Sequence, residues 1–214
     1  MQKSDILKKF GAHYVVNNDT FVMGTHHVFA NHIAIRFKGY NAVLDTCCGA
    51  GFMAIALAKV VNKVITFDIN KDHLSQAQIN AKIAGVFPKI EFIHANVSDI
   101  ENMKKIIPID GAFLDPDWAI LGKEKSEHTS RLSEMQPPAD SLIKLISAFT
   151  QNIALRLPKE IHNEELLPYS PYEAESFIMD RKLKFFTVYF GELRRDAHGS
   201  TFEISSSKLP NRFK

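Results

Sequence analysis

The segment AVLDTCCGAGF, residues 42–52, sets the architecture that we expect for this chain of 214 residues. Its apolar run Ala42–Leu44 is short and leads into a turn that contains two glycines, and a second apolar run, Val64–Phe67, ends on Asp68. This order predicts a strand, a glycine loop, a helix and a second strand that ends in an acid. Glycines allow a close approach of backbone to ligand, and the final acid can accept hydrogen bonds from both ribose hydroxyls. We therefore expect a cofactor that contains a nucleoside.

The acid Asp45 indicates which kind of cofactor. Dinucleotide folds use G-x-G-x-x-G, in which a helix N-terminus receives a pyrophosphate. Here Asp45 precedes the glycines, Met53 and Ala54 follow them, and an acid would repel a pyrophosphate. The pattern D-x-C-C-G-x-G instead resembles motif I of class I S-adenosylmethionine (SAM) methyltransferases. The alternatives are an ordinary glycine turn in an α/β protein and a dehydrogenase-like nucleotide site.

The rest of the chain continues to alternate between helical and strand patterns. We expect helices over residues 51–60, 71–84, 98–106 and 139–149, strands over 90–95, 111–115 and 152–157, and a loop or short helix over 122–136. This pattern is α/β and predicts a doubly wound, Rossmann-like class I methyltransferase sheet with helices on both faces. We expect a short N-terminal helical extension at 1–38 and the SAM-dependent methyltransferase domain at 39–214. Ligands of such sheets bind at the carboxyl ends of the strands, where Asp45, Asp68, Asn96 and Asp115 fall.

A second chemical signal is the loop Asp115, Pro116, Asp117 and Trp118. It resembles the (D/N/S)-P-P-(Y/F/W) loop of methyltransferases that act on planar exocyclic amines. Two acceptors on the amine hydrogens favour a pyramidal nitrogen, and a stacked aromatic ring holds the geometry for attack. Asp117 stands in place of the second proline. The alternative is a turn anchored by a buried tryptophan.

Three further segments are similar to the trimethylguanosine synthases, the RNA cap guanine-N2 methyltransferases. Residues 21–34 resemble the family segment that precedes motif I, with matches that include Thr25 and His32. Asn152–Lys159 resembles N-x-A-L-x-L-P-(R/K), and residues 173–193 resemble the family ending E-x-E-x-x-F…K-L-K…Y-(Y/F)-G-(D/E)-L. The similarity implies an RNA or nucleotide substrate and RNA capping chemistry, with adenine N6 or a protein amide as other acceptors and a non-catalytic SAM-binding subunit as a further alternative.

The resemblance also implies roles for single residues. Asp115, Pro116, Asp117 and Trp118 would form the catalytic loop, with Trp118 stacked on the base. The cofactor would be bound by Phe21, Thr25, Asp45, Cys47, Gly49, Gly51, Asp68, Ile69, Asn96, Val97 and Asp115. We expect an amphipathic helix up to Phe37 with Thr25 as its N-cap, and before it a turn over residues 21–25 that covers the cofactor. Residues 1–18 are then expected to be dispensable for SAM binding.

Composition agrees with a single enzyme domain. The chain is 45% hydrophobic and has a net charge of only +2, so its overall field does not indicate nucleic-acid binding. No signal peptide or membrane span is apparent, and the two adjacent cysteines form no zinc pair, so we expect a cytoplasmic protein with no membrane partner. The histidines lack metal-ligand spacing, and we expect no metal site. The oligomeric state stays open.

Overall fold

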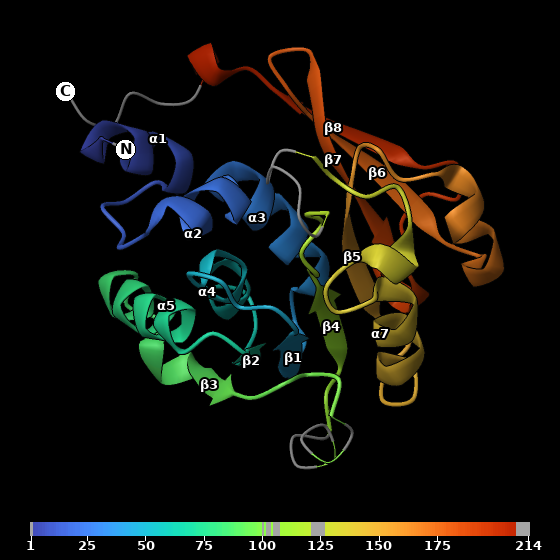
Figure 1. Cartoon of the computed structure of the whole chain (residues 1–214), viewed down its shortest axis with the longest axis horizontal. Coiled ribbons are helices and arrows are strands. Elements are labelled where there is room, and N and C mark those ends of the chain that lie inside the picture. The colour runs from blue at the N-terminus through green and yellow to red at the C-terminus, as the bar shows by residue number, and fades with distance from the viewer. Residues whose placement is uncertain (1, 100, 102–103, 105–107, 121–126, 209–214) are drawn as a thin grey trace.

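The computed structural model describes residues 2–99, 101, 104, 108–120 and 127–208. At its centre lies an eight-stranded sheet (Figure 1). The spatial order of the strands is β3-β2-β1-β4-β5-β7-β6-β8. Their bounds are β1 Ala42–Asp45, β2 Lys63–Asp68, β3 Ile90–His94, β4 Gly111–Leu114, β5 Ile153–Pro158, β6 Glu173–Met179, β7 Lys182–Tyr189 and β8 Ser200–Ile204.

The strand order reverses beside β1, as the doubly wound prediction requires. The chain moves from β1 outward through β2 to β3, and then returns to the other side of β1 for β4 and β5, all of them parallel. Strand β7 is antiparallel to both β5 and β6, and β8 runs parallel to β6. A reversal of this kind opens a crevice at the carboxyl ends of the two central strands, which are β1 and β4 here.

Helices cover both faces of the sheet (Figure 1). On one face α4 (Phe52–Ala58) and α5 (Lys71–Ile83) pack with α3 (His27–Ala34), and on the other lies α7 (Ala139–Ile146). These bounds confirm three of the expected helices. The helix expected over 98–106 falls largely outside the described residues. Short 3-10 helices span Ile35–Phe37, Phe87–Lys89, Leu132–Glu134, Asn163–Tyr169, Gly191–Leu193 and Ser206–Lys208.

The N-terminal segment differs in detail from its prediction. It contains α1 (Lys3–Phe10) and α2 (Asn18–Met23), so the expected turn over 21–25 is helical in its first half. Helix α3 starts at His27, and its N-cap is His26, whose side chain accepts a hydrogen bond from the Val28 amide at 3.3 Å. The N-cap assignment to Thr25 is therefore wrong.

Gly24 lies between α2 and α3. Its backbone is extended, at φ −62° and ψ 133°, so the helical hydrogen bonds stop there. A Cβ at this position would lie 2.8 Å from the rings of both Phe10 and Phe52, which stack with their centroids 3.7 Å apart. The chain can therefore pass these two rings only with a glycine. The pattern of apolar residues did not reveal this contact because Phe10 and Phe52 are distant in sequence.

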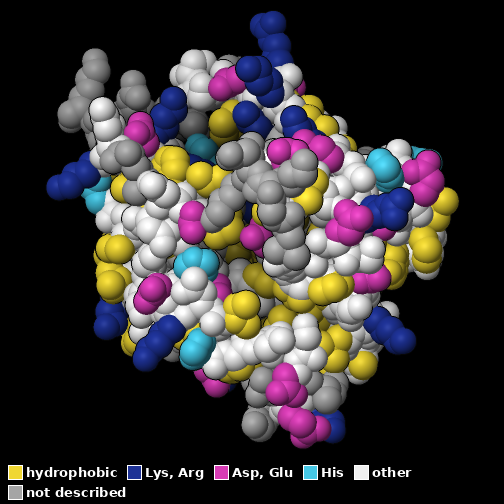
Figure 2. Space-filling model, viewed as in Figure 1, with side chains coloured by type: hydrophobic (Ala, Val, Ile, Leu, Met, Phe, Trp, Pro, Cys, Tyr) yellow, Lys and Arg dark blue, Asp and Glu magenta, His cyan; other side chains and the backbone are white. Residues whose placement is uncertain are grey.

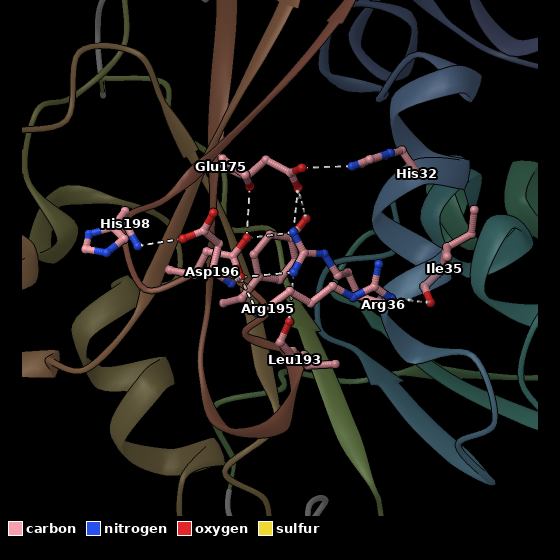
Figure 3. A network of polar contacts seen from close by, with 11 residues as sticks. His32, Ile35, Arg36, Glu175, Leu193, Arg195, Asp196 and His198 are labelled. Carbon is pink, nitrogen blue, oxygen red and sulfur yellow. Dashed lines mark hydrogen bonds and ion pairs between the residues drawn. The ribbon is translucent and has the colours of Figure 1, made fainter.

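A buried polar network ties α3 and the residues after it to the last strands (Figure 3). Arg36 donates to both carboxylate oxygens of Glu173, at 2.7 and 3.0 Å. His32 contacts Glu175 at 2.9 Å, and Tyr189 donates to the same carboxylate at 2.7 Å. Glu173 and Glu175 are 1% and 3% exposed, and burial of a carboxylate is tolerated only with such partners. The E-x-E motif therefore anchors a helix.

No helix among the described residues is long and apolar enough to cross a membrane.

Candidate functional site

Asp45 ends β1 at the reversal of strand order and is 1% exposed. Its Oδ2 accepts a hydrogen bond from Thr66 of β2 at 2.7 Å, whereas Oδ1 has no hydrogen-bond partner among the described residues. The pKa of Asp45 is raised to about 7, mainly by burial and also by the charges of Asp115 and Asp68, while the Thr66 hydrogen bond and Arg156 oppose the shift. A buried carboxylate with one free oxygen can receive a cationic or amino group.

Asp68 ends β2, and its side chain is hydrogen-bonded to the backbone of the glycine loop. Its Oδ2 accepts a hydrogen bond from the Gly49 amide at 2.8 Å, and its Oδ1 accepts one from the Asn70 amide, also at 2.8 Å. The two oxygens retain lone pairs that can accept from a ribose. The strand-end acid predicted from sequence is therefore placed against the loop with which it was expected to act.

The two loop glycines have different environments. Gly51 has φ +86° and begins α4, and a Cβ there would lie 2.9 Å from Cβ of Ala77 on α5. Gly49 has φ +52°, and a Cβ there would have no atom within 4 Å. Gly51 thus allows α4 and α5 to pack closely, and Gly49 borders open space in which a ligand can approach.

The expected acceptor loop follows β4 directly. Asp115 has a side chain that is 15% exposed, Pro116 is buried, and Asp117 is exposed. The backbone of Asp117 pairs with that of Gln136, and its side chain accepts from the Ala119 amide at 3.0 Å. The carboxylate of Asp117 therefore belongs to the local turn, which explains how the loop forms without a second proline. Figure 2 shows acidic side chains at a hollow near the centre of the face that is turned to the viewer in Figure 1.

Trp118 is half-buried and does not lie flat in open space. Its ring packs edge-on against His128, with centroids 5.5 Å apart, and its Nε1 is buried without a partner among the described residues. The guanidinium of Arg156 lies over the ring, 4.5 Å from its centroid. One face of the Trp118 ring is thus covered by the Arg156 guanidinium, a contact that the sequence did not predict.

Arg156 is the main site residue that sequence reasoning missed. It lies on β5 beside Asp115, and its Nε is 2.8 Å from Oδ1 of that carboxylate. The pKa of Asp115 is raised to about 6, mainly by burial with a smaller contribution from Asp117, while Arg156 opposes the shift. The signal was present in the sequence, because an arginine interrupts the otherwise apolar strand of residues 153–158.

The N-terminal segment reaches the site through Phe21 and Thr25. Phe21 packs against the apolar cluster of Phe10, Ala50 and Phe52, and its ring meets that of Phe10 edge-on with centroids 5.7 Å apart. Thr25 is 5% exposed, and its hydroxyl accepts a hydrogen bond from Arg156. The structure thus places Phe21 near the glycine loop. Thr25 instead contacts Arg156, beside the acceptor loop.

The remaining expected cofactor residues lie in the segments that follow β1, β2 and β3. Cys47 is half-buried, and burial together with Asp115 raises the pKa of its thiol well above the usual range. Ile69 is 73% exposed and Val97 is buried, while Asn96 is exposed and accepts from the Ser98 amide at 2.9 Å. An exposed isoleucine beside Asp68 can cover an apolar ring of a ligand. In the described part of the chain, no group of three or more metal-ligating side chains comes together.

These residues can hold an amino-bearing nucleoside beside a second, acidic and aromatic site. Asp45 offers a free buried oxygen, and the hydroxyl of Thr46 is also buried without a partner in the described structure. Two such groups next to each other in the chain fit a polar ligand, because an unpaired buried polar atom is costly.

Comparisons with known proteins agree with this geometry. A family model described as RNA cap guanine-N2 methyltransferase matches residues 40–193. The chain is 31% identical over 103 residues to a release factor glutamine methyltransferase of Borreliella burgdorferi, a match that covers 47% of this chain and 36% of that protein. A 23S rRNA (uracil(1939)-C(5))-methyltransferase of Legionella pneumophila is 29% identical over 73 residues, covering 34% of this chain and 16% of the relative. The chain therefore spans well under two thirds of these curated relatives.

Solved structures show the same fold. An O-methyltransferase of Streptomyces achromogenes involved in tomaymycin synthesis, solved with SAM, superposes with a TM-score of 0.61 at 12% identity, covering 89% of this chain and 90% of that one. TrmK of M. capricolum, solved with S-adenosyl-homocysteine, gives a TM-score of 0.54 at 15% identity, with 76% and 67% covered. Because the family model spans most of the sheet and both acidic strand ends, this chain belongs to the RNA cap guanine-N2 methyltransferase family, a family of SAM-dependent methyltransferases.

Proposed function

We propose that this chain transfers a methyl group from SAM to the exocyclic amine of a nucleic-acid base, of the RNA guanine-N2 type. The observation that carries the proposal is the position of Asp115, which directly follows β4, the neighbour of the strand β1 that ends in Asp45. SAM supplies an electrophilic methyl group on a sulfonium sulfur. The residues of the chain hold the two reactants against each other.

In this proposal Asp45, Asp68 and the glycine loop bind the cofactor, and Asp115 accepts hydrogen bonds from the amine. The nitrogen lone pair attacks the methyl carbon as the carbon–sulfur bond breaks, and the methylated nitrogen then loses a proton to solvent. Asp115 orients the amine and stabilises the developing positive charge on nitrogen. Trp118 limits the plane in which the base can lie. An RNA cap in the cytoplasm is the acceptor and the location that we favour, in keeping with the free thiols of Cys47 and Cys48.

The proposal is tested by transfer of radiolabelled methyl groups from SAM onto total RNA, total DNA and protein, followed by mass spectrometry of nucleosides and amino acids. We expect N2-methylated guanosine in the RNA fraction. Trp118→Ala should lower turnover at least tenfold with SAM affinity within about twofold, since a stacked aromatic contributes roughly 1–3 kcal/mol per base. Phe87→Ala, which removes a partly exposed ring on another part of the surface, is the matched control. A methylated base other than guanine, or full activity of Trp118→Ala, would contradict the assignment.

A protein amide is the second candidate acceptor. The observation in its favour is the similarity to the Borreliella burgdorferi release factor glutamine methyltransferase over 103 residues. Methylglutamine in the protein fraction, with none of the nucleosides labelled, would establish it. Binding of SAM without transfer to any fraction would favour a non-catalytic subunit, and a thermal shift with NAD but not SAM would indicate a dehydrogenase-like site.

A further inference from the structure

We propose that Arg156 is a positioning residue that holds Asp115 and Trp118 in place and joins this acceptor loop to the N-terminal helices. The inference rests on the proposed function only for its catalytic consequence. The side chain of Arg156 is 8% exposed, and its neighbours along β5 are buried apolar residues. A guanidinium at such a position is costly unless its donors are used, so its partners are informative.

On one side Arg156 faces the acceptor loop. Its Nε approaches Oδ1 of Asp115 at 2.8 Å, and its Cζ lies 4.5 Å from the centroid of the Trp118 ring. The contact with Asp115 is an ion pair without hydrogen-bond alignment, because neither atom has a hydrogen-bond partner among the described residues, and the Trp118 ring lies against the guanidinium. One side chain therefore sets the orientation of both the group that would accept from the amine and the ring beside it.

On the other side Arg156 holds the end of α2. Its Nη1 donates to the Thr25 hydroxyl, and its Nη2 donates to the Met23 carbonyl at 3.1 Å. Lys9 of α1 donates to the two preceding carbonyls, those of Phe21 and Val22. Three successive carbonyls at this helix end are thus bound by two cations, an arrangement that favours the negative end of a helix.

The electrostatic surroundings show what the chain would lose without Arg156. Asp115 is faced by Arg156, by the carboxylates of Asp117 and Asp45, and by the Cys47 thiol. Arg156 is the favourable charge in this set, and it opposes the effect of burial on the pKa of Asp115. Removal of Arg156 should therefore make the carboxyl neutral at a higher pH and free it to rotate.

Trp118 provides a direct measurement because it is the single tryptophan of the chain. Its fluorescence would be followed from pH 4.5 to 8.5 in a His128→Gln background, which removes the other titratable ring beside it. We expect a transition near pH 6 that is absent in Asp115→Asn, that moves up by about one pH unit in Arg156→Met, and that Arg156→Lys largely restores. Arg181→Met, at an exposed arginine in the turn between β6 and β7, should leave the transition in place. An unchanged midpoint in Arg156→Met would overturn the proposal.

Turnover provides the second readout. Arg156→Met should lower kcat at least tenfold, roughly the loss of one charged contact, with the Kd for SAM within about twofold at pH 8.5, where Asp45 is ionised. In the Asp115→Asn background the same replacement should have little further effect. Equal losses in both backgrounds would mean that Arg156 acts only on the fold.

If Arg156→Met does not fold, Arg156→Lys is the deciding variant. A positioning role predicts that Arg156→Lys retains the midpoint of the fluorescence transition and has a lower kcat. If no fraction is methylated, the proposed function fails, and fluorescence still tests the positioning role.

Discussion

Asp45 shows how a single buried residue can link cofactor binding to pH. Its pKa of about 7 lies well above the ordinary range for aspartate, and its ionised form is the one that attracts a cationic cofactor. The affinity for SAM should therefore rise about tenfold between pH 5.5 and 7.5. Calorimetric titration at a series of pH values measures this rise.

The cofactor-free protein should respond to pH in the opposite direction. The folded-state pKa of Asp45 is raised above its unfolded value, so its contribution to stability is complete below about pH 4 and is lost as the pH rises through about 7. Asp45→Asn should flatten both the affinity profile and this part of the stability profile. A pH-independent affinity in the wild-type protein would remove Asp45 from the cofactor site.

Asp68 should contribute to SAM binding in two ways. Asp68→Ala removes the acceptor for the ribose hydroxyls and also the hydrogen bond that holds the Gly49 amide at 2.8 Å. We expect SAM binding to weaken by about 2 kcal/mol or more, measured by calorimetry. Asp72→Ala, an exposed acid in the first turn of α5, is the control that should leave binding intact. An unchanged Kd in Asp68→Ala would contradict the role.

At the scale of elements, the segment that contains α1 supports the glycine loop. Asn80 of α5 is fully buried and donates to the carbonyls of both Val15 and Ala50, while its Oδ1 accepts from the Val15 amide at 2.7 Å. Phe10 stacks on Phe52 just after this loop. These contacts reverse our expectation that residues 1–18 are dispensable.

Deletion of residues 1–18 should therefore weaken SAM binding at least tenfold, because it exposes Phe52 and removes both hydrogen bonds between Asn80 and Val15. Deletion of residues 1–4 is the matched control, because it keeps the contact of Phe10 with Phe52 and the hydrogen bonds of Asn80 with Val15. Calorimetry with circular dichroism separates lost binding from lost folding. Wild-type affinity in the longer deletion would restore the original expectation.

At the scale of the whole molecule, the buried network joins early and late parts of the chain. Arg36 lies just after α3, and Glu173 and Glu175 lie on β6, near the far edge of the sheet from β3. Breaking a buried ion pair leaves an uncompensated charge, so Arg36→Met should lower the free energy of unfolding by about 3–5 kcal/mol. Denaturant unfolding measures this loss.

The control for this prediction is Lys63→Met, which breaks an exposed ion pair with Glu91. That change should cost less than about 1 kcal/mol. Because the hydrogen bonds of Arg36 go to Glu173 and the Leu193 carbonyl, the Arg36→Met protein that remains folded should still bind SAM. A stability loss no larger than that of the control would show that the network is not needed to hold α3.

The sequence by itself determined the central part of the fold. Strand and helix periodicity around the glycine loop predicted β1, β2, α4 and α5, and placed Asp45, Asp68 and Asp115 at strand ends, because these features depend on neighbouring residues. Only the tertiary structure decided which side chains meet across strands. Arg156 pairs with Asp115 because β4 and β5 are adjacent, and only a glycine fits at position 24 because two rings from distant segments stack beside it. Such contacts depend on packing between segments far apart in the chain, which local patterns do not encode.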